Sequence, residues 1–352
     1  MTVRGPLKGV ILAAGYGTRM AALTQVVPKP LLPIVNVPTV ERILQAFKGV
    51  GITDALIITG YLADAIEAYC GDGTQWGMAI HYQPQTEVSG TGSAAAMAAE
   101  YVGDQPFMLT YGDILLDAAE YQAVVDLYQQ PGCEAATTLN RLKDVSTGSA
   151  VYLDGNRIRE IIEKPPPGTS TSNLNNAGVF VFPPAIFDAI ARTPQSIRGE
   201  YELTEAVQTM VSDGTDVRSH VIPGVQYDVG TPETYMKTNI SLIGTFSNSD
   251  THRATADNFA SPNLDIEPPV AISETSEIER CRLGPNVCIA DGVRIGHSVS
   301  IRNSVIMPGA DIGDGASLSF AIIGRCANVS NRARLQGRAE EVVVAGDGKT
   351  AE

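Results

Sequence analysis

The sequence lacks several features that define other classes of protein. It has no run of roughly 18 uncharged apolar residues, so no segment is expected to cross a membrane as a helix. Lys and Arg number only 25 against 39 Asp and Glu, and the resulting net charge of −14 argues against general binding to nucleic acid or to anionic lipid. The N-terminus does not resemble a signal peptide, because the apolar run after Lys8 is short and leads into a glycine motif.

Cysteine and histidine are scarce and scattered. No CxxC pair occurs, and the histidines show no spacing typical of metal ligands. The cysteines are Cys70, Cys133, Cys281, Cys288 and Cys326, and the histidines are His81, His220, His252 and His297. We expect reduced, mostly buried thiols in a cytoplasmic protein rather than disulfides or a zinc site.

Apolar runs and segments of helical periodicity alternate between residues 8 and about 235. Residues 10–13 (VILA), 56–59 (LIIT) and 107–110 (FMLT) are typical of buried strands, and a helix is expected from Pro38 to Gly51. This order predicts an α/β fold with a Rossmann-like, mostly parallel sheet covered by helices on both faces. Ligands of such sheets bind beyond the carboxyl ends of the strands.

The C-terminal part carries a repeat with a period of six residues. The register slips by one at Ile312 and resumes at Leu318. The repeating aliphatic residues are Leu283, Ile289, Ile295, Ile301 and Met307, with Val287, Val293, Val299 and Val305 four positions after the first four. A period of six predicts a short parallel β-helix rather than helical repeats.

These differences in composition and residue pattern predict that the chain has four parts. Residues 1–244 are expected to form the α/β domain, and residues 245–280, which are polar and rich in turn residues, a linker. Residues 281–335 are expected to form the β-helix. Residues 336–352 are charged and rich in Gly and Ala, which predicts a flexible tail.

A glycine motif, residues 15–19 (GYGTR), follows the first predicted strand, and residues 28–33 (PKPLLP) come soon after. Glycines let the backbone approach a ligand closely and point successive N–H groups at an anion, while Arg19 can hold phosphate oxygens bidentately. A dinucleotide fingerprint would need glycine where Met20 stands, and the Gly-Lys-Ser/Thr of a P-loop is absent. The alternative is a plain strand and turn with a surface arginine.

Together these two motifs resemble the signature of the sugar-1-phosphate nucleotidylyltransferases, and the six-residue repeat resembles the left-handed β-helix that several members carry. The resemblance covers about residues 8–330 and implies transfer of a nucleoside monophosphate from an NTP to a sugar-1-phosphate, or to a similar cyclitol phosphate. The implied catalytic residues are Arg19, Lys29 and Asp113. The implied nucleotide-binding residues are Leu12, Ala13, Ala14, Gly15, Gly17, Thr18, Gln85, Gly90 and Thr91.

The resemblance also implies groups for the sugar phosphate and for a metal. Gly148, Glu163, Lys164 and Asn176 match positions that contact the sugar or its phosphate. Asp113 and Asp228 match a pair of Mg²⁺ ligands, and hard carboxylate oxygens suit that ion. Taken alone, Asp228 is equally typical of a turn or of a helix cap, and Glu163 with Lys164 of a solvent-exposed ion pair.

One departure from the family pattern concerns rigidity. Members usually have a proline soon after the arginine, whereas residues 20–24 here are MAALT. No charged group is lost by this change, but the stiffness of the phosphate loop is in question.

Several alternatives stay open. The β-helix, which contains His297, is expected to be a scaffold for a homo-oligomer, but it could also transfer an acyl group, as in related two-activity enzymes. A non-catalytic subunit that senses nucleotide sugars is a second alternative, although the charged site residues all remain. A pure assembly module is the third. UTP or dTTP is the favoured substrate, and GTP is possible.

Overall fold

The computed structural model describes residues 5–245, 254–255 and 264–352. Its contacts divide the chain into two compact units, each interrupted in sequence. Unit 1 contains residues 1–16 and 40–227, and unit 2 contains residues 17–39 and 228–352.

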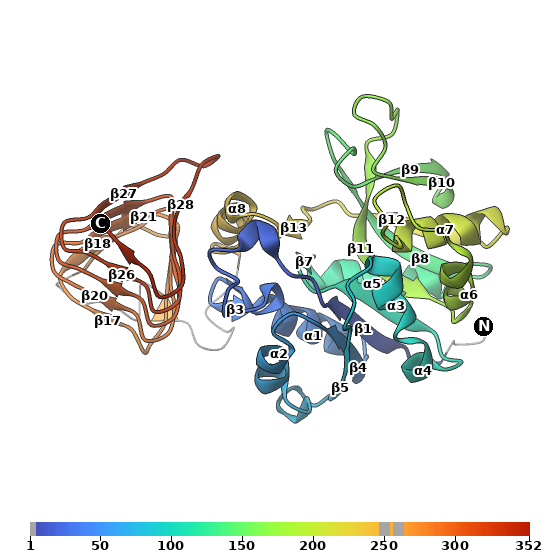
Figure 1. The fold of residues 1–352 in the computed structure, drawn as a ribbon, viewed down its shortest axis with the longest axis horizontal. Helices are drawn as coiled ribbons and strands as arrows, with labels where there is room; N and C mark the ends of the chain where they lie inside the picture. Colours follow the sequence, from blue (N-terminus) through green and yellow to red (C-terminus); the bar gives the residue numbers. More distant parts are fainter. Residues whose placement is uncertain (1–4, 246–253, 256–263) are drawn as a thin grey trace. The chain divides into compact units, whose positions relative to one another are not determined.

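Unit 1 is built around a nine-stranded mixed sheet with the order β5-β4-β1-β6-β11-β8-β12-β10-β9. Helices cover both of its faces (Figure 1). The nine strands of this sheet are β1 (Lys8–Ala13), β4 (Asp54–Thr59), β5 (Ala79–Pro84), β6 (Phe107–Tyr111), β8 (Ala135–Arg141), β9 (Ser149–Asp154), β10 (Arg157–Glu163), β11 (Leu174–Phe182) and β12 (Val217–Val221). The short strand β7 (Ile114–Leu115) lies outside it, and β13 (Tyr227–Asp228) spans the unit boundary. The helices are α1 (Thr39–Gly49), α2 (Ala63–Cys70), α3 (Thr91–Ala96), α4 (Ala99–Val102), α5 (Ala118–Tyr128), α6 (Ala185–Arg192) and α7 (Leu203–Ser212).

The predicted Rossmann-like sheet is confirmed, and its first strands follow from their composition. β1 pairs in parallel with β4 on one side and with β6 on the other, and β4 pairs in parallel with β5. Residues 10–13, 56–59 and 107–110 are all buried, as expected for strands covered on both faces. The sheet is mixed because β11 runs antiparallel between β6 and β8.

Parallel pairing brings the carboxyl ends of four strands to one edge of the sheet. Ala13 pairs with Thr59, Leu12 pairs with Tyr111, and the Gly112 N–H donates to the Leu12 carbonyl at 2.8 Å. The Gln85 N–H donates to the Thr59 carbonyl at 2.7 Å. The chain therefore leaves β1, β4, β5 and β6 at the same edge, which is where the sequence predicts ligand contacts.

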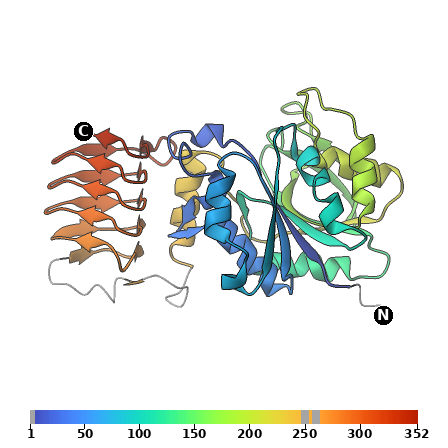
Figure 2. The same ribbon diagram turned by 60° about the horizontal axis from the view of Figure 1, so that its bottom comes forward.

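Unit 2 contains a parallel β-helix, seen side-on in Figure 2 as a stack of coils. Three sheets form its sides, and each adds one strand per coil. The strands are β15 (Leu264–Ile266), β16 (Val270–Ile272), β17 (Glu277–Ile278), β18 (Cys281–Leu283), β19 (Val287–Ile289), β20 (Arg294–Ile295), β21 (Ser300–Arg302), β22 (Ser304–Ile306), β23 (Asp311–Ile312), β24 (Ser317–Ser319), β25 (Ala321–Ile323), β26 (Asn328–Val329), β27 (Arg334–Gln336), β28 (Val343–Ala345) and β29 (Thr350–Ala351), with β14 (Ala254–Thr255) added antiparallel to β16. The predicted β-helix is thus present, and the repeating aliphatic residues from Leu283 to Ile301 belong to its core. Val305 and Met307 do not, because Ile306 pairs with Ile289 and takes the inward position there.

The slip in the six-residue repeat is a change in coil length. Leu283 pairs with Ile301, 18 positions later, whereas Ile301 pairs with Leu318 after 17. The corner between Ile301 and Ser304 is one residue shorter than the corner between Leu283 and Val287, so the slip comes earlier than the sequence predicts, before Val305.

The predicted ends of the β-helix were wrong. Residues 264–280, expected to be linker, form β15, β16 and β17, which pair in parallel with the next coil. Residues 246–253 and 256–263 of the expected linker lie outside the described residues. The expected flexible tail forms the last coil, because β28 pairs with β25 and β29 pairs with β26.

The expected boundary at residue 244 also differs from the observed units. Residues 17–39 contact the C-terminal part of the chain and include two 3₁₀ turns, Thr18–Met20 and Lys29–Leu31, and the short strands β2 (Pro33–Ile34) and β3 (Val37–Pro38). Helix α8 (Pro232–Leu242) belongs to the same unit. Residues 17–39, which include the second half of the glycine motif, therefore pack against residues more than 190 positions later in the chain.

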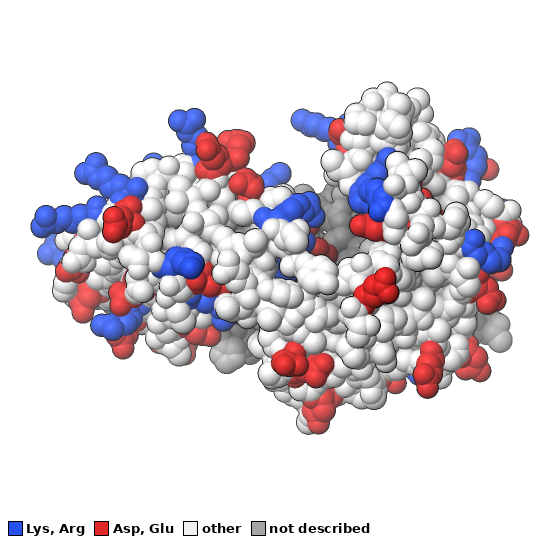
Figure 3. Space-filling view, in the orientation of Figure 1, with Lys and Arg blue, Asp and Glu red and all other residues white. Residues whose placement is uncertain are grey.

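Charges of both signs are interspersed on the face in Figure 3, with Lys and Arg beside Asp and Glu over the β-helix. No helix among the described residues is both long and apolar enough to span a bilayer. Four cysteines, Cys70, Cys133, Cys281 and Cys288, are buried as expected, and Cys326 is exposed.

The last coil yields a stability prediction. Deleting residues 343–352 would uncover Ile322, Ile323 and Val329, which β28 and β29 cover in the structure. We expect Tm, followed by circular dichroism, to fall by roughly 5 °C or more, since buried aliphatic area is lost. The exposed Lys349→Ala variant should stay within about 1 °C of the parent protein. A deletion as stable as the parent would mean that these residues are a dispensable tail.

Candidate active site

The glycine motif begins where β1 ends. Ala14 lies against Gly60, where an added Cβ would come within 2.6 Å of the Ala14 carbonyl oxygen. Gly15 is different, because a Cβ there would meet no atom within 4 Å and its φ lies outside the left-handed region. The fold of the chain alone therefore does not require glycine at position 15, and close approach of a ligand would explain it.

The second half of the motif forms a tight turn in unit 2. Gly17 has φ +63°, a conformation that favours glycine, and the Met20 N–H donates to its carbonyl at 2.8 Å. The Thr24 hydroxyl donates to the same carbonyl at 3.2 Å. Thr18 and Arg19 are exposed on this turn, so the guanidinium is available to an anionic ligand.

Lys29 starts the second 3₁₀ turn of this segment. Its neighbours Pro28 and Pro30 are buried, and the Leu32 N–H donates to the Lys29 carbonyl at 3.1 Å. The half-buried Lys29 side chain thus extends from backbone that is fixed on both sides.

The predicted base-binding segment packs on the start of α7. An added Cβ at Gly90, whose φ is +122°, would lie 2.3 Å from the Tyr201 carbonyl oxygen, so glycine is required there. The Gly92 N–H donates to that carbonyl at 2.7 Å, and the Thr91 hydroxyl accepts from the Leu203 N–H at 3.0 Å. Main-chain contacts with Tyr201 set the course of this loop.

Gln85 is buried, and its amide is oriented by a neighbour. Gln85 Nε2 donates to Ser93 Oγ at 3.2 Å, and Ser93 Oγ donates to the Gly90 carbonyl at 2.8 Å. Gln85 and Gly90 are therefore brought together, as the resemblance implies, through Ser93, which the sequence analysis did not identify.

Gly148 and Lys164 are joined directly. The Lys164 N–H donates to the Gly148 carbonyl at 2.7 Å, and Lys164 has φ +42°, a strained conformation for a residue with a side chain. A Cβ at Gly148 would lie 2.1 Å from Asn175 Oδ1, which instead accepts from the Ser149 N–H at 2.8 Å. Glycine at 148 is thus a packing requirement of the fold.

Asn176 is held more tightly than expected for a sugar contact. Its Nδ2 donates to Thr137 Oγ1 at 2.9 Å, and its Oδ1 accepts from the Gly178 N–H at 2.8 Å. The residue is 9% exposed, and both polar atoms of the amide make hydrogen bonds. The structure therefore gives Asn176 a role in fixing the start of β11, with only one N–H left for a ligand.

Glu163 lies at the end of β10 in an electrostatically costly position. Burial raises its pKa, and the neighbouring carboxylate of Glu202 adds to the rise, while Thr204, Lys164 and Arg198 oppose it. The Thr204 hydroxyl donates to Glu163 Oε2 at 2.7 Å. Glu163 is thus not the solvent-exposed member of a simple ion pair.

The two predicted metal ligands belong to different units and are described separately. Asp113 is half-buried and follows β6 at the carboxyl edge of the sheet. Asp228 is exposed, and an added Cβ at Gly230 would lie 2.6 Å from its Oδ2, so glycine there makes room for the carboxylate. Thr231 caps α8, with its hydroxyl accepting from the Thr234 N–H at 3.2 Å, so Asp228 is not the helix cap.

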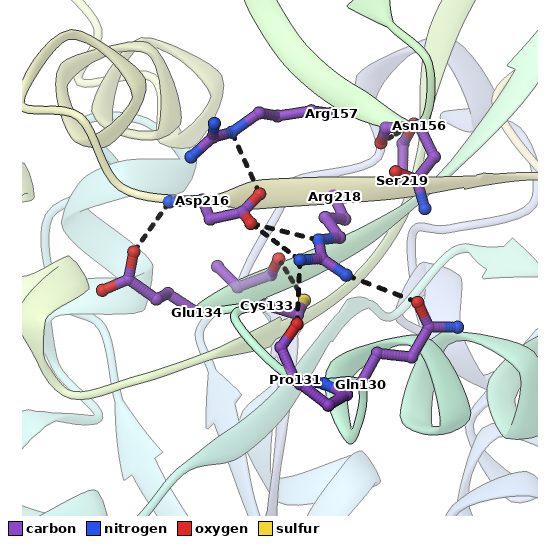
Figure 4. Close-up of polar contacts among 10 residues, drawn as sticks. Gln130, Pro131, Cys133, Glu134, Asn156, Arg157, Asp216, Arg218 and Ser219 are labelled. Carbon is purple, nitrogen blue, oxygen red and sulfur yellow. Dashed lines mark hydrogen bonds and ion pairs between the residues drawn. The ribbon is translucent and has the colours of Figure 1, made fainter.

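A further charged cluster lies at the opposite edge of the sheet (Figure 4). Arg218 Nη2 lies 2.8 Å from Asp216 Oδ2 and donates to the Pro131 carbonyl at 3.0 Å, and Arg157 Nε lies 3.1 Å from Asp216 Oδ1. Glu134 Oε2 accepts from the Asp216 N–H at 2.8 Å. These charged groups pair with one another at the amino ends of β8 and β12. We therefore interpret the cluster as holding the loops before these strands in place rather than as binding a ligand.

Comparisons with known proteins identify the family of the chain. A family model described as "Nucleotidyl transferase" matches residues 8–243, and one described as "GMPPB C-terminal domain" matches residues 266–351. The chain is 29% identical over 337 residues to a glucose-1-phosphate thymidylyltransferase of Streptomyces griseus, a match that covers 94% of this chain and 90% of that protein. It is 27% identical over 339 residues to mannose-1-phosphate guanylyltransferase 1 of Arabidopsis thaliana, covering 94% and 89%.

A solved structure, that of a UDP-glucose pyrophosphorylase complexed with UDP-glucose, has the same fold. The TM-score is 0.62 at 23% identity, with 69% of this chain and 100% of that chain covered. From the extent of the family match, the chain belongs to the nucleotidyl transferase family, and it is a nucleotidyltransferase.

The raised pKa of Glu163 predicts a change of stability with pH. Ionising this buried carboxyl group opposes folding. The resulting loss in the free energy of unfolding is absent below the ordinary pKa of a glutamate, and it grows as pH rises through the higher pKa that Glu163 has in the folded protein. The Tm of Glu163→Gln should therefore exceed that of the parent at pH 7.5, and the difference should vanish at about pH 4. Glu160→Gln, an exposed change on the same strand, should show no such trend. If Glu163→Gln and the parent had the same Tm as each other at pH 7.5 as well as at pH 4, the account would be contradicted.

Proposed function

We propose that the protein transfers a nucleoside monophosphate from an NTP to a sugar-1-phosphate, or a similar cyclitol phosphate, and releases an NDP-sugar and pyrophosphate. The observation that carries the proposal is the glycine motif at the carboxyl end of β1. Gly15 has no packing reason to be glycine, and the motif continues through Gly17, which has a left-handed conformation, into a 3₁₀ turn that exposes Arg19. The family membership, and the sugar phosphates named for the relatives, support the same reaction.

The reaction needs positioning and charge neutralisation rather than a nucleophilic side chain. A sugar phosphate is already largely anionic near neutral pH, because its second pKa is about 6, so it attacks the α-phosphorus in line without a general base. In this proposal Arg19 and the N–H groups after Ala14 hold the triphosphate, and Lys29 stabilises charge at the α-phosphate. Lys164 holds the phosphate of the sugar.

The remaining predicted residues bind the two organic groups. Leu12, Ala13, Ala14, Gly15, Gly17 and Thr18 line the nucleotide, with Gln85 and the Gly90 and Thr91 backbone at the base. Gln85 suits a base edge because its amide both donates and accepts. Glu163 and Gly148 accept from sugar hydroxyls, and Asn176 supports them from within the β11 network.

Asp113 and Asp228 would hold Mg²⁺. Both offer hard carboxylate oxygens, and the described residues contain no group of three or more His, Cys, Asp or Glu side chains arranged around a metal. Mg²⁺ commonly takes one or two carboxylates and fills its other positions with phosphate oxygens and water, which fits this donor set. When bound, the ion neutralises developing charge on the phosphates.

We also propose that the protein works in the cytoplasm as a homo-oligomer associated through the β-helix. The buried cysteines support a reducing compartment. The support for self-association is the general prevalence of symmetric oligomers.

The first test is a substrate panel. Five NTPs, each with several sugar-1-phosphates, should be scored by pyrophosphate release, and we expect activity with dTTP or UTP. Relatives are named for both thymidylyl and guanylyl transfer, so GTP is the third candidate. No release with any pair, while the protein remains folded, would contradict the proposed reaction.

The second test removes two charged groups. Lys29→Ala and Asp113→Asn should each lower kcat about 10²–10³-fold, which is typical when one group that stabilises transition-state charge is removed. Lys48→Ala, at an exposed position of α1, is the matched control and should keep the parental rate. Tm values equal to that of the parent would show that the fold is intact. Near-parental turnover in both site variants would refute the assignment.

A further inference from the structure

The last coil of the β-helix contacts the segment that follows the glycine motif. The Asp347 N–H donates to the Ala22 carbonyl at 3.1 Å, two residues after the 3₁₀ turn that carries Arg19. Gly346 lies against the same carbonyl, and an added Cβ there would come within 2.9 Å of it. Ala22 is thus held by residues that the sequence analysis assigned to a flexible tail.

Three more contacts fix the other end of the 17–39 segment within unit 2. The Tyr235 hydroxyl donates to the Pro33 carbonyl at 2.6 Å, and the Val35 N–H donates to Asn239 Oδ1 at 2.8 Å. Asn36 Nδ2 donates to the Ile289 carbonyl in the β-helix at 2.8 Å. Because this end is anchored by α8 and an inner coil, Ala22 is where the last coil can influence the motif.

Asp347, whose N–H is the donor in this contact, is itself held by hydrogen bonds. Asp347 Oδ1 accepts from the Arg325 N–H at 2.8 Å, one coil earlier, and the Lys349 N–H donates to the Gly346 carbonyl at 3.1 Å. The position of the Asp347 N–H is therefore set by the stacking of the last coil on the coil before it.

We propose that Gly346 and Asp347 are positioning residues for the phosphate-binding turn, acting through the Ala22 carbonyl. The inference rests on the proposed function for its kinetic consequence. The turn lacks the proline that the family usually has after the arginine, and residues 20–24 are MAALT. In this chain the last coil supplies a restraint at that place, so the N–H groups and Arg19 meet the triphosphate already ordered.

The test compares two glycine variants. Gly346→Ala crowds the Ala22 carbonyl, whereas Gly313→Ala crowds the exposed Asn331 Oδ1 of the next coil, at 2.5 Å. We expect Gly346→Ala to lower kcat/KM for the NTP by about ten- to a hundredfold, with KM for the sugar phosphate within about twofold of the parent. Gly313→Ala should lower Tm without this selective loss.

Hydrogen exchange gives a readout independent of activity. In Gly346→Ala the amides of Met20 and Leu23 should exchange faster than in the parent, and those of β1 and β6 should not change. Unaltered exchange and kinetics in a folded Gly346→Ala protein would overturn the inference. A parent protein that releases no pyrophosphate would instead contradict the proposed function, and the exchange comparison would still test the contact.

The parent protein provides a measurement that needs no variant. If the last coil and the turn act together, adding dTTP or UTP should slow exchange in peptides that contain Asp347 as well as in those that contain Arg19. If exchange slows in the peptides that contain Arg19 but is unchanged in those that contain Asp347, the inference is overturned, even if Gly346→Ala does not fold.

Discussion

The parallel pairing of β1 with β4 and β6 is the constraint on which the site in unit 1 depends. Because Ala13 pairs with Thr59 and Leu12 with Tyr111, the chain leaves three neighbouring strands at one edge. The glycine motif and Asp113 follow directly from two of those exits. A slip of one residue in this register would move the end of β1 by about 3.3 Å relative to the ends of β4 and β6, and would displace the glycine motif with it.

Around that edge, the fold accepts unfavourable local states. Lys164 has a positive φ, and Glu163 is a carboxyl group whose pKa is raised by burial. Hydrogen bonds from neighbouring strands and from α7 hold both, including the Lys164 N–H to Gly148 and the Thr204 hydroxyl to Glu163. A strained backbone conformation and a shifted pKa, held in place by surrounding hydrogen bonds, are typical of ligand sites.

Sequence patterns predicted the features that local chemistry determines. Short apolar runs identified β1, β4 and β6, and the six-residue period identified the β-helix, because both depend on which side chains must be buried. The last coil was missed because the spacing of paired residues rises from 17, between Val305 and Ile322, to 22, between Ile322 and Val344, which breaks the period.

Other features depend on residues far apart in the chain, which no local pattern encodes. The amide of Asn176 is oriented by Thr137, 39 positions away, so its predicted sugar contact could not be weighed against a packing role. Likewise, nothing in residues 17–39 indicates that Asp347 holds them. The predicted roles of the site residues themselves remain predictions, derived from motifs and placed by the fold.

A crystal structure of the protein with bound NDP-sugar tests the central claim most directly. The account predicts that the diphosphate lies against the N–H groups of residues 15–19 and that the sugar hydroxyls contact Glu163 and the Gly148 backbone. An NDP-sugar bound elsewhere, with the N–H groups of Gly15 and Gly17 facing only solvent, would contradict it.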